Sequence, residues 1–276
     1  MPRLPNTDAG TGVPVVLVHG LGGFKEGWGR LPEAIVGGGR RALAVDLPGF
    51  GEAPPHPGPP TRSHVDGVLD LLERTGPGVL VGHSLGAQTV LSCAARAPRL
   101  VRGLVLLGPY VVPRPVRVLP RSLRDLALLP GVGPVLTAPA IALVRRSPAR
   151  RRRAFLAAVA RPERLSAGSP EALLVEEAAR RLAHTDVRVL AGWASEGLRR
   201  GGLVDCPRVV APVLSIAGDR DRLVPAHHRS LLAGALPQMR QVVLAKVGHF
   251  PHLEDPSGTA AAVDAALRTW SRAGAW

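Results

Sequence analysis

Short apolar runs bounded by turn residues recur along this chain of 276 residues. Each run is apolar almost throughout instead of alternating with polar positions, which is the pattern of a strand buried on both faces. Helix-like stretches separate the runs. We expect strands at residues 13–20, 41–48, 78–84, 101–108, 212–219 and 240–249. We expect helices at about 26–36, 62–74, 84–97, 226–235 and 256–271.

Buried strands that alternate with helices predict an α/β fold, with a mostly parallel sheet and helices on both faces. The interval 111–207 departs from this alternation, because it holds no convincing strand and is punctuated by proline and glycine. Its segment "SPEALLVEEAARRLA" at 169–183 begins with Ser, Pro and Glu, a strong start signal for a helix. We therefore expect a core at 1–110 and 208–276, and an inserted all-helical cap at 111–207.

Chemically active residue types follow several of the expected strands. In open α/β sheets, ligands bind beyond the carboxyl ends of the strands. The segments found there include "HGLGG" at 19–23, "GHSLG" at 82–86, "GDRDRLVP" at 218–225 and "GHFPH" at 248–252. A serine, two aspartates and several histidines are therefore expected at one edge of the sheet. Packing alone does not explain this convergence.

The pattern G-x-S-x-G between a strand and a helix, followed by an acid and then a histidine, resembles the α/β-hydrolase fold superfamily. The similarity covers the core strands on both sides of the insertion, and the insertion matches only as a generic helical cap. The resemblance implies that Ser84 is the nucleophile, His249 the general base and Asp221 the acid that orients the base. It places the oxyanion hole at the backbone N–H groups of Leu21 and Leu85. It implies no metal and no organic cofactor.

Two of these roles have alternatives in the sequence. Asp219 lies two residues before Asp221, but the family's spacing from the preceding glycine to the following proline favours Asp221. Asp219 is then interpreted as a turn or capping residue that pairs with a neighbouring arginine. His252 lies one turn past His249 and is the second candidate for the base.

Other polar residues near the strand ends are expected to have structural roles. We expect His19 to brace the glycine-rich loop that follows it, and His83 to pack away from the serine. His227 and His228 are expected at a helix start, facing solvent. Asp46, in "DLPGFG", is interpreted as part of a turn.

The start of the chain departs from the family pattern. Only about a dozen residues precede the first strong strand, so the antiparallel hairpin that often opens this fold is expected to be shortened or missing. The segment "LPNTDAGTGVP" at 4–14 is long enough for a remnant only.

The net charge of +14 does not indicate nucleic-acid binding. Lys25 and Lys246 are the only lysines, so arginine carries almost all of the charge, as expected for a GC-rich coding sequence. Aromatic residues make up 3% of the chain and are not interleaved with the basic ones, as nucleic-acid binding would require. The densest basic segment, "RRSPARRRR" at 145–153, is interpreted as a solvated helix face or as a docking site for an anionic substrate handle or an acidic membrane surface.

Several features predict a cytoplasmic protein. No run approaches the 18 or so apolar residues that span a bilayer, and the first residues lack the layout of a signal peptide. The two cysteines, Cys93 and Cys206, form no disulfide framework and fit no metal-binding spacing. The sequence predicts no particular oligomeric state.

Serine at position 84 favours acyl transfer to water, because related haloalkane dehalogenases and epoxide hydrolases carry aspartate there. We expect hydrolysis of a carboxylic ester with a small hydrophobic acyl group. Thioesters, lactones, amides and C–C bonds are alternative targets of the same three residues, and a non-catalytic binding member of the fold is a further alternative. Apolar residues of the expected cap have two expected roles. Any single one is expected to pack the cap on the core, and as a group they are candidates to line the acyl pocket: Leu126, Leu128, Leu129, Leu136, Ile141, Leu143, Trp193 and Leu198.

Overall fold

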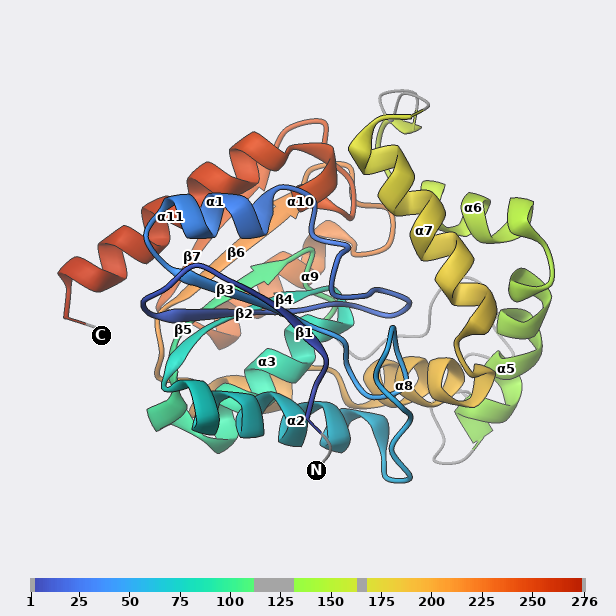
Figure 1. Ribbon diagram of the computed structural model, residues 1–276, viewed down its shortest axis with the longest axis horizontal. Coiled ribbons are helices and arrows are strands. Elements are labelled where there is room, and N and C mark those ends of the chain that lie inside the picture. The colour runs from blue at the N-terminus through green and yellow to red at the C-terminus, as the bar shows by residue number, and fades with distance from the viewer. Residues whose placement is uncertain (1–2, 112–131, 163–167, 275–276) are drawn as a thin grey trace.

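The computed structural model describes residues 3–111, 132–162 and 168–274 (Figure 1). Within them, seven strands form one sheet in the order β1-β3-β2-β4-β5-β6-β7. β1 is antiparallel to β3, and all the other neighbouring strands are parallel. The strands are β1 (Asn6–Ala9), β2 (Pro14–Val18), β3 (Arg41–Val45), β4 (Gly78–His83), β5 (Val101–Leu107), β6 (Val213–Gly218) and β7 (Met239–Leu244).

The α/β class and the six expected strands are confirmed, with differences at the two ends of the sheet. β1 is the remnant expected at 4–14, a single four-residue strand that pairs with β3. The last strand ends at Leu244, not at residue 249 as predicted, so His249 lies in a loop. β7 is also not buried on both faces, because it has only one neighbouring strand and its outer positions meet solvent.

Alternate residues of the central strands enter two separate cores. Val15 and Leu17 of β2 belong to a cluster on one face of the sheet, and Val16 and Val18 belong to a cluster on the other face. Side chains on a strand point alternately to opposite faces, so a strand covered on both sides needs apolar residues at every position. This is the physical reason for the unbroken apolar runs in the sequence.

Helices cover both faces of the sheet (Figure 1). α1 (Leu31–Gly37) and α11 (Pro256–Arg272) lie on one face, and α2 (Pro60–Thr75) and α3 (Leu85–Arg96) lie on the other. α1 begins five residues later than expected, because residues 26–30 form turns. The described chain also contains the 3-10 helices η1 (Pro98–Leu100) and η3 (Leu203–Arg208), and the helices α9 (Ala226–Ala235) and α10 (Pro251–Glu254).

Between β5 and β6, the described residues form helices and no strand. Ser147, Ser169 and Asp186 each accept a backbone N–H as the N-cap of one of these helices, and the Ser-Pro start expected at residue 169 is confirmed. The last of the helices is part of the main core, because its Leu190 and Trp193 belong to the cluster that covers one face of the sheet. The helices are α5 (Val132–Arg145), α6 (Pro148–Leu156), α7 (Pro170–His184) and α8 (Val187–Arg200).

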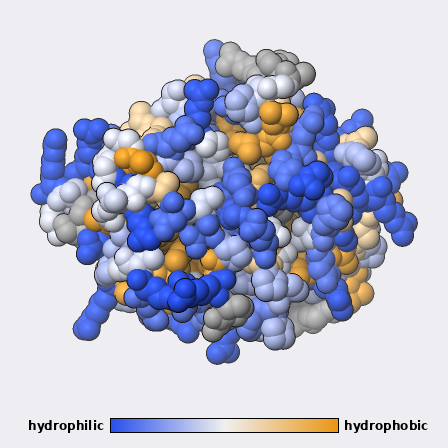
Figure 2. Space-filling view, in the orientation of Figure 1, coloured by the Kyte–Doolittle hydropathy of each residue, from blue (hydrophilic) through white to orange (hydrophobic). Residues whose placement is uncertain are grey.

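The face of the molecule seen in Figure 2 is mostly hydrophilic, with smaller apolar areas. None of the described helices is long and apolar enough to cross a membrane. Cys93 and Cys206 are buried and do not form a disulfide. The described residues contain no group of three or more histidine, cysteine or acidic side chains placed to hold a metal ion.

Candidate active site

Ser84 occupies the tight turn between β4 and α3. Its backbone has φ 52° and ψ −118°. Among the described non-glycine residues, only Ser84 and Lys246 have a positive φ. Such conformations are strained and are maintained only by the surrounding structure. Here the Ser84 N–H donates to the Leu107 carbonyl at 3.0 Å, and the Ser84 carbonyl accepts the N–H of Ala87 at 3.1 Å. The strained turn thereby places the hydroxyl beyond the end of β4.

The glycines around this turn allow other backbone to approach it closely. A Cβ on Gly86 would lie 2.3 Å from the Val18 carbonyl oxygen, and one on Gly82 would lie 2.7 Å from the Gly86 carbonyl oxygen. A Cβ on Gly20 would lie 2.9 Å from the Cβ of Ser84. Real Cβ atoms do not approach other atoms so closely, so any larger residue at these positions would force the neighbouring atoms to shift.

The serine hydroxyl begins a chain of hydrogen bonds through three loops. Ser84 Oγ lies 2.9 Å from His249 Nε2, and His249 Nδ1 lies 2.8 Å from Asp221 Oδ2. A carboxylate can only accept, so Nδ1 carries a proton, and whenever Nε2 carries none it can accept from the serine hydroxyl. This is the arrangement in which an imidazole can remove the proton of a serine hydroxyl.

Asp221 is held in place by its own loop. Its Oδ1 atom accepts the backbone N–H groups of Leu223 at 2.8 Å and Val224 at 2.9 Å. Burial alone would raise the pKa of Asp221, but the positive charge of a protonated His249, its hydrogen bond and the two N–H groups together lower the pKa below the usual 3.8. The carboxylate therefore stays ionised and can stabilise an imidazolium beside it.

The structure does not bring the two alternative residues into this chain. Asp219 accepts the backbone N–H groups of Lys246 at 2.6 Å and Val247 at 3.3 Å, which is the turn role expected for it, but it forms no ion pair with a neighbouring arginine among the described residues. His252 is buried against the Trp28 ring, with ring centroids 5.2 Å apart. Burial lowers the pKa of His252 to about 3, so the ring stays neutral at ordinary pH.

The backbone N–H groups expected to form the oxyanion hole border the same space as the serine. Leu21 and Leu85 both line the cavity that contains Ser84. Neither N–H donates a hydrogen bond to another group in the part of the chain that the structure describes. Both donors are thus available to an oxygen atom of a ligand.

Ser84 and His249 border a cavity of about 370 Å³, a volume typical of small-molecule sites. The core supplies one wall, and helices α5, α6, α7 and α8 supply the other. Among the described residues that line it there is no aspartate, glutamate, lysine or arginine. Apart from Ser84, Tyr110 and the two histidines His83 and His249, the lining side chains are apolar.

The residues expected to line an acyl pocket have different positions. Ile141 and Leu198 line the cavity. Trp193 packs against Phe50 and His64 in the core, which is the alternative role expected for it. The prediction for Leu143 is wrong, because this residue is 52% exposed. Leu126, Leu128 and Leu129 lie outside the described residues, as does the side chain of Leu136.

Three further groups hold the loop that contains His249, and no pattern in the sequence points to them. His83 donates from Nε2 to the His249 carbonyl at 2.9 Å, so it contacts the base and does not pack away from the site. The His249 N–H donates to the carbonyl of Ala158, which follows α6, at 2.9 Å. The carboxylate of Glu254 accepts the N–H groups of Gly248, Phe250 and Ala160.

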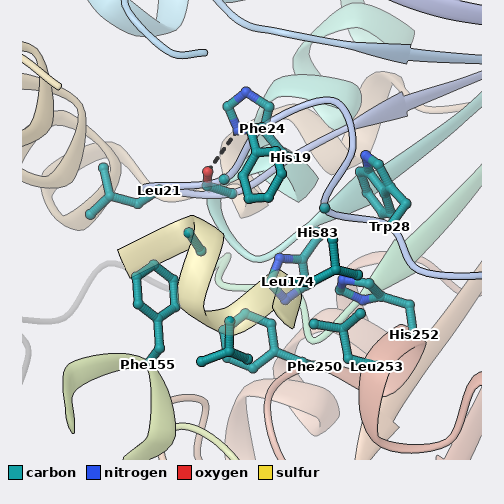
Figure 3. A pocket seen from close by; sticks show the side chains of 15 residues that line it. His19, Leu21, Phe24, Trp28, His83, Phe155, Leu174, Phe250, His252 and Leu253 are labelled. Carbon is teal, nitrogen blue, oxygen red and sulfur yellow. Dashed lines mark hydrogen bonds between the residues drawn. The ribbon is translucent and has the colours of Figure 1, made fainter. Parts of the chain in front are cut away.

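A second, smaller cavity of about 50 Å³ lies beside the site (Figure 3). Figure 3 shows the rings of His19, His83 and His252 around it. His19 donates to the Gly20 carbonyl at 2.8 Å and accepts the Leu47 N–H at 3.1 Å, so its expected bracing role is confirmed. Burial lowers the pKa of His83 well below the ordinary value, which keeps this ring neutral next to His249.

Two other expectations about polar residues have clear outcomes. Asp46 accepts the backbone N–H groups of Lys25 at 2.7 Å and Glu52 at 2.9 Å, which confirms its role in a turn. His227 is exposed as expected, but the prediction for His228 is wrong, because its side chain is buried against the Tyr110 ring.

The sequence matches the family described as the alpha/beta hydrolase family over residues 15–262. Among curated proteins, the 2-hydroxymuconate semialdehyde hydrolase of Pseudomonas sp. (strain CF600) is 37% identical over 116 residues, which are 40% of this chain and 41% of that protein. The chain thus matches about two fifths of the length of the first such relatives, or less.

Solved structures resemble the chain over nearly its whole length. A thermophilic esterase from Thermogutta terrifontis has a TM-score of 0.75 and 25% identity, covering 97% of this chain and 93% of the esterase. The enol-lactonase from Burkholderia xenovorans LB400 has a TM-score of 0.76 and 20% identity, covering 96% of both chains. At 20% identity the likeness to the enol-lactonase concerns the fold alone.

Proposed function

The chain belongs to the alpha/beta hydrolase family and is a hydrolase, and from this premise we propose that it is a serine hydrolase that cleaves carboxylic esters of small hydrophobic acyl groups. The observation that carries the proposal is the hydrogen-bonded series Asp221–His249–Ser84, which ends in an apolar cavity. The catalytic roles of these residues, and of the Leu21 and Leu85 N–H groups, are part of the proposal.

In the proposed mechanism, Ser84 Oγ attacks the ester carbonyl carbon while His249 Nε2 accepts the hydroxyl proton. The negative charge that develops on the carbonyl oxygen is stabilised by the N–H groups of Leu21 and Leu85. Asp221 stabilises the imidazolium. The C–O bond to the alcohol then breaks, His249 returns the proton to the leaving alkoxide, and an acyl-serine remains.

Water completes the reaction at the same residues. His249 removes a proton from a water molecule, which attacks the carbonyl carbon of the acyl-serine. When the second tetrahedral intermediate collapses, the bond to Ser84 Oγ breaks and His249 returns the proton to the serine. One ester and one water thus give one alcohol and one carboxylic acid, without a net change at any residue.

Helices α5, α6, α7 and α8 are proposed to act as the cap of this site. Ile141, Phe155, Leu182 and Leu198, one from each helix, line the cavity opposite the serine. Because aliphatic and aromatic side chains form most of this wall, acyl groups without charge are the favoured substrates.

Reaction with a fluorophosphonate probe tests the proposal directly. We expect folded wild type to be labelled at Ser84, and Ser84→Ala to lose both labelling and at least ~10⁴-fold of its turnover of chromogenic esters. A non-catalytic binding protein with this fold would not be labelled. Absence of labelling in the folded wild type, or equal labelling of Ser84→Ala, would refute the serine hydrolase.

Hydrolysis of C–C bonds is a second candidate, because a relative named 2-hydroxymuconate semialdehyde hydrolase shares 37% identity over part of the chain. A muconate-derived compound carries a carboxylate, however, and no lysine or arginine lines the described part of the cavity to pair with one. An anion buried without a partner is costly. We therefore expect neutral esters to be better substrates than dienoates, and parallel assays of ester, thioester, lactone and dienoate rank these reactions.

A further inference from the structure

The outer side of α5 exposes a row of apolar positions. Val135, Pro139 and Leu143 are four residues apart, so they lie along one face of the helix. Val135 is 69% exposed and Leu143 is 52% exposed, and Pro139 between them is exposed as well. The structure describes no element that covers this row.

Basic side chains continue the same surface. Arg146 directly follows α5, and α6 presents Arg150, Arg152 and Arg153 to solvent. The described residues give Arg146 and Arg153 no acidic partner, and Arg152 has only the exposed Glu176, at 3.6 Å. The sequence from 132 to 162 contains no acidic residue at all.

These exposed apolar and basic residues together form what we call the α5–α6 surface: Val135, Pro139, Leu143, Arg146, Arg150 and Arg153. Helices α5 and α6, which carry it, lie at the right of the molecule in Figure 1. Arg150 lies in the first turn of α6, where the helix dipole disfavours positive charge, whereas Arg153 lies in its last turn. Three exposed arginines close together, with no acidic residue between 132 and 162, favour an anionic partner.

The same two helices also form a wall of the cavity. Ile141 and Val144 of α5 and Phe155 of α6 line it on their inner side. One side of the α5–α6 pair thus meets the candidate site, and the other side carries the exposed apolar row and the arginines. A partner that binds the outer side lies a single helix away from the cavity.

We propose that the α5–α6 surface docks on an anionic phospholipid bilayer. Apolar side chains that enter the acyl boundary, surrounded by basic side chains that meet the headgroups, are the pattern of an interfacial helix. The net charge of +14 attracts the protein to the same surface. Nucleic acid would leave the apolar row without a partner, whereas a bilayer offers both kinds of contact.

The docking does not depend on the proposed hydrolysis, but its consequence for the substrate rests on it. If Ser84 is the nucleophile, docking would keep the candidate site close to esters of small hydrophobic acyl groups that partition into the bilayer.

Vesicle co-sedimentation tests the docking with the full chain. We expect binding to vesicles of phosphatidylglycerol and phosphatidylcholine, weakening as salt screens the charges, and little binding to phosphatidylcholine alone. Each arginine near an anionic surface contributes about a fivefold gain in affinity. Arg146→Glu combined with Arg153→Glu should therefore lower the affinity by at least about twentyfold.

A matched control separates this surface from general charge attraction. Arg240→Glu combined with Arg272→Glu changes the net charge by the same amount at exposed sites on β7 and at the end of α11. We expect this variant to bind nearly as well as wild type. Equal losses in the two double variants would overturn the proposal, as would failure of wild type to bind anionic vesicles.

The apolar row has its own test. Val135→Ser combined with Leu143→Ser alters only exposed side chains, so the fold should be retained, as circular dichroism can verify. We expect severalfold weaker vesicle binding, and unchanged binding would overturn the role of the row. Ser84→Ala should bind vesicles like wild type, so docking can stand even if fluorophosphonate labelling fails.

Discussion

At the scale of single residues, Ser84, His249 and Asp221 come from three loops, and different local interactions hold each of them in place. Ser84 is placed by a strained turn, Asp221 by two backbone N–H groups, and His249 by hydrogen bonds to its own backbone. The hydrogen bonds among the three side chains are between 2.8 and 2.9 Å. A substitution at any one of them should therefore change activity and stability in a different way.

Asp221→Asn should lower kcat/KM by ~10⁴-fold with the fold intact, because an amide no longer holds the imidazole in the required tautomer. The substitution should also change the pH dependence of stability. The folded-state pKa of Asp221 lies below 3.8, so its stabilising contribution is present above pH 3.8 and is lost as the pH falls through the folded-state value.

Urea unfolding of wild type and Asp221→Asn between pH 2 and 7 measures this contribution. We expect the difference between their free energies of unfolding to be constant above about pH 5 and to shrink below about pH 4. A difference that grows on acidification would contradict the assignment of an ionised Asp221.

Gly20→Ala should impair the reaction more than the fold. The new Cβ would lie 2.9 Å from the Cβ of Ser84, so the loop that carries Leu21 must move away from the serine. Loss of one oxyanion donor typically lowers kcat by ~10²–10³-fold. Gly234→Ala in α9, where a Cβ meets nothing within 4 Å, is the matched control and should leave ester turnover unchanged.

At the scale of elements, Glu254 joins two parts of the chain that are distant in sequence. Its Oε2 atom accepts the N–H groups of Ala160 at 2.7 Å and Gly248 at 2.9 Å, and its Oε1 atom accepts that of Phe250 at 3.1 Å. Burial raises the pKa of Glu254, although these three N–H groups act in the opposite direction. The segment after α6 and the His249 loop thus share one carboxylate.

Glu254→Gln should weaken this connection between the two segments. The amide NH₂ group is a donor, and it would replace a carboxylate oxygen that accepts a backbone N–H. Hydrogen bonds to a charged group contribute about 1.5–3 kcal/mol each, so a marked loss of stability is expected on urea unfolding. If Glu254 positions His249, kcat should fall about tenfold with little change in KM. Glu176→Gln on the exposed side of α7 is the control. An equal loss of kcat in this variant would show that Glu254 does not position His249.

At the scale of the whole molecule, the cavity exists because helices α5 to α8 face the carboxyl ends of the strands across a gap lined by apolar side chains. α8 is packed into the main core through Leu190 and Trp193, whereas α5 and α6 meet the core mainly around the cavity. The size of the acyl group should therefore depend on side chains that these helices contribute.

Ile141→Trp should shorten the acyl groups that the cavity accepts, because the larger ring enters the space opposite Ser84. We expect turnover of a chromogenic octanoyl ester to fall at least about tenfold relative to the acetyl ester. Leu143→Trp, two residues later on the exposed side of α5, should leave this ratio as in wild type. An unchanged ratio in Ile141→Trp would show that the acyl group binds elsewhere.

The sequence by itself determined the α/β class, the positions of the central strands and the turn at Ser84. These features are local, because an unbroken apolar run is written in consecutive residues and a strained turn needs its glycines as immediate neighbours. The sequence also placed Asp219, Asp221 and His249 at the same edge as Ser84, since the carboxyl ends of parallel strands meet there. The preference for Asp221 over Asp219 came from the residue spacing of the family that the chain resembles.

Only the tertiary structure decided what surrounds those residues. His83 contacts the His249 carbonyl, and Glu254 binds the N–H of Ala160. Both interactions link residues far apart in the chain, so no periodic pattern in the sequence predicts them. The same holds for the candidate pocket residues, of which Ile141 lines the cavity while Leu143 faces solvent. Two residues on one helix can point to opposite sides, and which side meets the core depends on how the helix packs.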